Sequence, residues 1–100
     1  MDLTLKDNGT STDIIISGNI KSISDTDNIK FAITNTWNKD EKNPINLKID
    51  DSFIITSSVI GFLIKFIKKD KIPLTLYVKN EELYEMLEDM NLVEVLNVRR

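Results

Sequence analysis

The stretch that decides the fold is residues 45–64, which read INLKIDDSFIITSSVIGFLI. Its first five residues alternate apolar and polar side chains, which is typical of a β-strand with one buried face. After a short apolar run at 53–55, the trio Thr56-Ser57-Ser58 supplies the hydroxyl side chains that favour a helix N-terminus. Apolar residues then recur at helical spacing, at Val59, Ile60, Leu63, Ile64 and Ile67. The stretch therefore predicts a strand followed by a helix.

Upstream of this stretch, the sequence predicts a hairpin and a helix. Residues 3–6 alternate and meet Asp7-Asn8-Gly9, a turn because Asn and Gly tolerate positive φ, and the β-branched run 13–18 follows. Ser24 or Asp25 is expected to cap a helix that runs to about Lys39. Its apolar face comprises Ile29, Ala32, Ile33, Thr36 and Trp37, and we expect Trp37 in the core.

Downstream, the same alternation of elements continues. The second helix is expected to end at Asp70-Lys71-Ile72-Pro73, before a strand at 74–78. Asn80 then caps a third helix with Glu81 and Glu82 in its first turn, where acidic residues are favourable. Its expected buried stripe is Leu83, Met86, Leu87 and Met90. Asn91 is suited to a left-handed C-cap, and residues 92–98 are expected to form a last strand.

The predicted order is therefore β-β-α-β-α-β-α-β over one domain, residues 1–100. Strands that alternate with helices after a hairpin indicate an α/β fold with a mostly parallel sheet. One hundred residues are enough for one modest hydrophobic core without disulfide or metal support.

Composition narrows the classes of function. The chain has no Cys and no His, which excludes disulfides, thiolate zinc sites and His-dependent nucleophilic catalysis. The net charge of -3 leaves no basic stripe, so we expect no direct nucleic-acid binding. The most apolar stretch, 59–67, is broken by Lys65 and is too short to span a membrane, and residues 1–7 do not resemble a signal peptide. We expect a cytoplasmic protein without membrane insertion.

The element order and the motif at 56–61 resemble the STAS domain, the fold of bacterial anti-sigma factor antagonists and of the cytosolic tails of sulfate transporters. That family has Asp-Ser-Ser-Gly-Leu-Gly at the start of a helix, and the matching residues here are Thr56-Ser57-Ser58-Val59-Ile60-Gly61. Residues 74–78, 81–90 and Asn91-Leu92 match the later strand, helix and ending. The chain departs from the family at Thr56 and at Val59, and we expect the terminal helix that is common in the family to be missing or abbreviated here.

The resemblance implies a partner switch. Ser57 matches the family's phosphorylated serine, and the implied partners are an anti-sigma factor with serine kinase activity and a serine phosphatase. The protein would be a substrate and a ligand without a cofactor, not an enzyme. The alternative is a constitutive STAS-like subunit of a larger assembly, such as a membrane lipid-transport ATPase complex, which the departures at Thr56 and Val59 favour.

The residues themselves also support a modification site at Ser57. A hydroxyl at a helix start is accessible, and a phosphate there lies near free backbone N–H groups. The structural alternative is that Ser57 or Thr56 simply caps the helix, which contributes about 1 kcal/mol. Thr56 and Ser58 are the alternative phosphate acceptors.

Two aromatic residues follow Ser57 and suggest where a partner binds. If Ile60, Leu63, Ile64 and Ile67 form the buried stripe, Phe62 lies off it and Phe66 lies near its edge. Together with Ser57 and Ser58, Phe62 and Phe66 are expected to form an apolar contact surface. The alternative is that another helix covers both rings.

Acidic side chains form two further groups. Asp50 and Asp51 could be a carboxylate pair, but no third metal ligand accompanies them, and we expect solvated turn residues. The acidic run of the third helix is expected to form its outer face, with partner binding as the alternative, and comprises Glu81, Glu82, Glu85, Glu88 and Asp89.

Overall fold

The computed structural model describes all 100 residues. The strands are β1 (Asp2–Asp7), β2 (Thr12–Ser17), β3 (Ile45–Ile49), β4 (Leu74–Val78) and β5 (Val98–Arg99). The helices are α1 (Ile23–Lys39), α2 (Ser57–Ile64), its π-helical continuation η1 (Lys65–Lys69), and α3 (Glu81–Asp89). The element order predicted from the sequence is therefore the order found.

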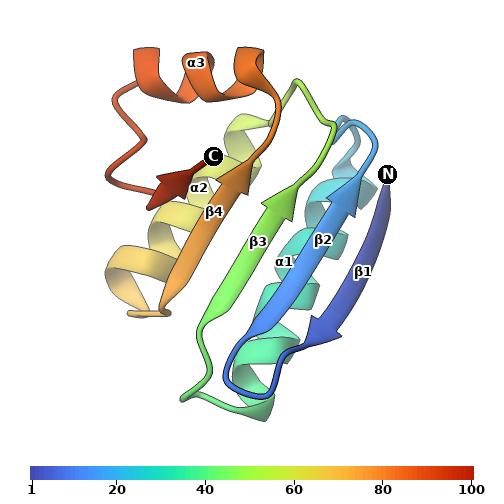
Figure 1. Ribbon diagram of the computed structural model, residues 1–100, viewed down its shortest axis with the longest axis vertical. Helices are drawn as coiled ribbons and strands as arrows, with labels where there is room; N and C mark the ends of the chain where they lie inside the picture. The colour runs from blue at the N-terminus through green and yellow to red at the C-terminus, as the bar shows by residue number, and fades with distance from the viewer.

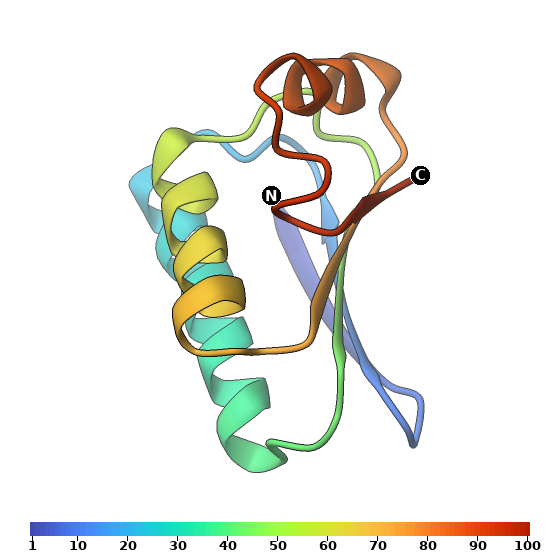
Figure 2. The same ribbon diagram turned by 90° about the vertical axis from the view of Figure 1, so that its left-hand side faces the viewer.

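The five strands form one sheet in the order β1-β2-β3-β4-β5, in which β1 is antiparallel to β2 and the other neighbours are parallel. Helices α1 and α2 cover one face of this sheet, and α3 lies across the end of the sheet where β4 stops (Figure 1). Figure 2 shows that no helix covers the opposite face. The prediction of an α/β domain with a mostly parallel sheet is confirmed.

The hydrophobic core lies between the sheet and the two covering helices. Strands β3 and β4 alternate between buried and half-buried residues, as the sequence pattern predicts. Helix α1 contributes Ile29, Ala32 and Ile33, while Trp37 is half-buried and packs against the core. None of the helices is long and apolar enough to cross a lipid bilayer.

Helix α1 begins earlier than expected. Its cap is Ser22, not Ser24 or Asp25: the Ser22 Oγ accepts a hydrogen bond from the Asp25 N–H at 3.0 Å. The Asp25 carboxylate accepts in return from the Ser22 N–H at 3.3 Å. This reciprocal capping box requires an acidic residue three positions after the cap, and Asp25 meets that requirement for Ser22.

The buried stripe of α2 and η1 also differs from the expected one. The buried residues are Val59, Ile60, Leu63 and Phe66, whereas Ile64 and Ile67 are only half-buried. Phe66 borders the same surface depression as Trp37 of α1, and its ring belongs to the hydrophobic core.

In the C-terminal region, one expectation from the sequence is confirmed and two are wrong. Asn91 has φ +58° and ends α3, with the Leu92 N–H bonded to the Leu87 carbonyl, so the predicted left-handed C-cap is confirmed. Met90 is 49% exposed and does not belong to the buried stripe. Residues 93–97 form hydrogen-bonded turns instead of a strand, and a second left-handed residue, Asn97, ends them before β5.

Candidate functional site

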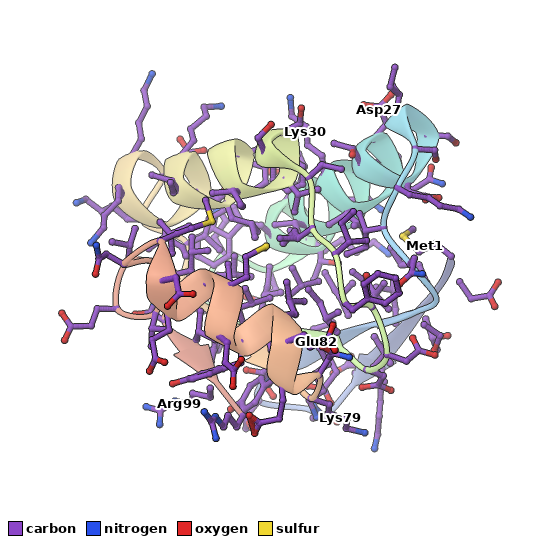
Figure 3. The ribbon with its side chains drawn as sticks, turned by 90° about the horizontal axis from the view of Figure 1, so that it is seen from above. Met1, Asp27, Lys30, Lys79, Glu82 and Arg99 are labelled. Carbon is purple, nitrogen blue, oxygen red and sulfur yellow. The ribbon has the colours of Figure 1, made fainter.

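The parallel strands β2, β3 and β4 end on the same side of the molecule, and the loops that follow them meet there. This is the end seen from above in Figure 3, where α1 and α2 begin and α3 lies beside them. In α/β proteins, ligands and partners usually bind at this end of a parallel sheet because the variable loops gather there.

The loop between β3 and α2 is held in place by three of its own side chains, Asp50, Asp51 and Ser52, of which the sequence pattern did not indicate Ser52. Ser52 is fully buried; its hydroxyl donates to the Ile54 carbonyl at 2.7 Å and accepts from the Ile20 N–H at 3.2 Å. The Asp51 carboxylate accepts from the Gly18 N–H. Asp50 forms an ion pair with Lys79 at 3.5 Å. These bonds fix the loop. No group of three or more Asp or Glu side chains lies close enough together to hold a metal ion.

The first turn of α2 divides its three hydroxyl residues between two tasks. Thr56 is the N-cap: its Oγ1 accepts from the Val59 N–H at 3.2 Å and lies 3.3 Å from the Thr26 hydroxyl of α1. Ser57 and Ser58 are exposed. Since Thr56 caps the helix, Ser57 is not needed for capping, and its hydroxyl faces solvent.

Apolar side chains lie close to these two serines. A shallow depression of about 400 Å³ separates the start of α2 from α1 and is lined by Ile23, Thr26, Asp27, Lys30, Ser58 and Phe62. Ile23 is 83% exposed, and Phe62 is half-buried. We call Ile23, Ser57, Ser58 and Phe62 the Ser57 surface. Ile23 was not predicted as a contact, because the expected helix start placed it in a loop.

Phe66 does not belong to the Ser57 surface. The sequence pattern predicts Phe66 as an exposed contact beside Phe62, and this prediction is wrong because Phe66 is only 5% exposed. Its ring centroid lies 5.6 Å from that of Phe62. Phe66 therefore supports the Phe62 ring from the core side and cannot meet a partner directly.

A second hollow, of about 260 Å³, lies on the uncovered sheet face and is lined by Asn46, Lys48, Asp50, Tyr77, Lys79 and Arg100. Its cations are already paired: Lys48 with Asp13 at 3.0 Å, and Arg100 with Glu81 at 3.1 Å. Burial raises the pKa of Asp13, but hydrogen bonds from Asn46 and Lys48 outweigh it, so the net pKa lies below the ordinary value. These ion pairs stabilise the open face and leave little free charge for a ligand.

The outer face of α3 carries the acidic side chains predicted for it, and all five are exposed.

Comparisons of the chain with family models, with curated proteins and with solved structures gave no match.

Proposed function

We propose that this chain is a STAS-like regulatory domain of the cytoplasm that binds a partner protein through the Ser57 surface, and that phosphorylation of Ser57 releases the partner. The observation that carries the proposal is the first turn of α2. Thr56 caps the helix there, Ser57 is exposed, and the next residue, Ser58, lines a depression together with the exposed Ile23 and the half-buried Phe62.

The charge of the helix start is a further argument for Ser57 as a phosphate acceptor. Helices α1 and α3 have acidic residues in their first turns, but α2 has none. The partial positive charge of the α2 N-terminus is therefore not compensated by a side chain. A phosphate of about -1.5 to -2 charge on Ser57 would supply that compensation without disturbing the fold.

The same phosphate would oppose partner binding. Ile23 and Phe62 offer apolar contacts on either side of the depression next to Ser58. A partner that covers them would also remove water from a charge at Ser57, and an unpaired buried charge is costly. By the resemblance to anti-sigma factor antagonists, the partner would be an anti-sigma factor with serine kinase activity, and a phosphatase would restore binding.

Intact-mass measurement after incubation with ATP and an extract of the source cells tests the modification. We expect the mass of one phosphate, mapped to Ser57 by fragmentation. Ser57→Ala should remove this mass, and the matched control Ser58→Ala should keep it. Phosphate that persists on the Ser57→Ala variant would contradict the assignment of the acceptor.

Affinity measurement with the purified partner tests the switch. Ser57→Asp should weaken binding by about 1–3 kcal/mol. Asn38→Asp adds the same charge to an exposed position in the last turn of α1 and should not change binding. Equal affinity of wild type and Ser57→Asp would show that Ser57 lies outside the interface.

A constitutive STAS-like subunit is the second candidate. Thr56 stands where the resembling family has Asp, and its hydroxyl is occupied by the bond to the Val59 N–H. A phosphorylation site at Ser57 therefore lacks the neighbouring carboxylate that the family usually has. If wild type gains no phosphate but Ser57→Asp still weakens the complex, the Ser57 surface is a permanent interface and this second function holds.

A further inference from the structure

The two edges of the sheet differ in length. At one edge, β5 has only two residues, whereas at the other edge β1 has six and pairs only with β2. Figure 1 shows β1 with no element on its outer side. Alternate residues of an edge strand direct their backbone N–H and C=O groups away from the sheet, so β1 presents unpaired groups that a further strand can use.

The sequence of β1 complements itself in the antiparallel direction. Residues 2–6 read Asp-Leu-Thr-Leu-Lys. If a two-fold axis passes beside Thr4, Asp2 of one copy faces Lys6 of the other, Leu3 faces Leu5, and Thr4 faces Thr4. Opposite charges, apolar pairs and paired hydroxyls are the cross-strand combinations that stabilise a sheet.

An apolar hollow of about 360 Å³ flanks β1 on the helix side of the sheet, and its lining includes Leu3, Leu5 and Phe31. Phe31 is 71% exposed and Leu5 is 50% exposed. Leu3 and Leu5 are paired with Ile16 and Ile14, whose side chains are in the core, so both leucines lie on the side that α1 covers. A two-fold axis beside Thr4 would bring this hollow against its own copy.

We propose that the chain forms a two-fold symmetric dimer through antiparallel pairing of β1 with β1, which joins two five-stranded sheets into one continuous sheet. The occupant of the edge is a second copy because the charges of β1 match those of β1 itself. The same surface patch then serves both subunits, as a two-fold interface requires.

The dimer is compatible with the Ser57 surface but does not depend on it. Asn28, Phe31 and Asn35 of α1 line the hollow beside β1, whereas Ile23, Asp27 and Lys30 line the depression beside α2. These are two different flanks of one helix. Each dimer would therefore carry two accessible Ser57 surfaces.

Sedimentation equilibrium over a range of protein concentrations tests the pairing. Wild type should dimerise, and Asp2→Lys or Lys6→Asp should each raise the dimer Kd roughly tenfold or more, because like charges then face each other twice. An equimolar mixture of the two variants should recover the wild-type Kd as a heterodimer, since opposite charges face each other again. This recovery also separates a charge effect from partial unfolding of either variant.

Three results would overturn the proposal: a monomeric wild type at every soluble concentration, a dimer that neither variant weakens, or a mixture that is no tighter than the variants alone. The first means that the edge is unoccupied or accepts another protein. The other two mean that the copies meet elsewhere.

The apolar flank has its own test in a pair of variants on α1. Phe31 and Ile23 are both exposed, so Phe31→Ala and Ile23→Ala should leave the melting temperature nearly unchanged. Phe31→Ala should raise the dimer Kd roughly tenfold, as truncation of an interface aromatic does, whereas Ile23→Ala should not. Equal dimer Kd values for the two variants would remove Phe31 from the interface and contradict the two-fold axis beside Thr4.

Discussion

Helices α1 and α2 lie side by side on one face of the sheet and begin at the same end of the molecule, yet their side chains are used differently (Figure 2). Helix α1 starts with a charged capping box and leaves two large apolar residues, Ile23 and Phe31, in solvent. Helix α2 starts with an uncharged threonine cap, and its continuation η1 buries Phe66. The difference suggests that α1 is built to display apolar surface and α2 to accept charge.

The largest expected effect separates the two phenylalanines. Phe66→Ala should lower the free energy of unfolding by about 3–5 kcal/mol, because it leaves a cavity in the hydrophobic core. Phe31→Ala should change it by less than about 0.5 kcal/mol, since the ring is mostly in solvent. Chemical denaturation of the monomeric state of both variants measures the two values. If Phe31→Ala unfolds as early as Phe66→Ala, then α1 buries its aromatic face and the contrast between the helices is wrong.

The contrast between Phe31 and Phe66 also marks a limit of inference from sequence. The strands at 45–49 and 74–78 have the predicted bounds because alternation along a strand is a local pattern. The turn at Asn91 is likewise local, since it depends on the residue that must adopt positive φ. The burial of Phe66 depends on the tertiary packing around η1, and no pattern within residues 57–69 contains that information.

Competing local patterns explain the remaining differences between the elements expected from the sequence and those found in the structure. Five polar residues between 22 and 27 can cap a helix, and only the reciprocal bonds of Ser22 and Asp25 decide among them. Val93 and Val95 favour a strand by their branching, but the Leu96 N–H bonds to the Leu92 carbonyl and closes a helical turn instead. At the site, the exposure of Ser57 follows from capping by Thr56, which the sequence left as one of two possibilities.

The second expected effect is a difference in pH response between the two helix starts. Backbone N–H groups of Lys21 and Ser22 donate to the Asp25 carboxylate and hold its pKa below the ordinary value. Because the folded pKa is lowered, the stabilisation by Asp25 is complete above the unfolded pKa of about 3.9 and is lost as the pH falls through the folded pKa. The Thr56 cap carries no charge, so its contribution to stability should not change with pH.

Amide chemical shifts in a titration by NMR measure this difference directly. The Ser22 and Lys21 amide signals should titrate with a midpoint below about 3.9, whereas the Val59 amide, which donates to Thr56, should show no such step. Asp25→Asn should abolish the step at Ser22. A titration of the Ser22 amide at or above the ordinary midpoint would show that the carboxylate is not held by the backbone.

The smallest expected effect is the change in the free energy of unfolding when a negative charge is added at each helix start. Ser57→Asp places a carboxylate in the first turn of α2, which has no acidic residue, and should raise the free energy of unfolding by about 0.3–1 kcal/mol. Ser24→Asp makes the same change in the first turn of α1, where Asp25 already lies, and repulsion between the two carboxylates should reduce the gain. Denaturation at low salt measures the change in the free energy of unfolding for each variant. At high salt, screening should reduce the difference between the two changes. If Ser24→Asp stabilises the protein as much as Ser57→Asp, the α2 start is not the less compensated of the two, and the electrostatic argument for a phosphate on Ser57 fails.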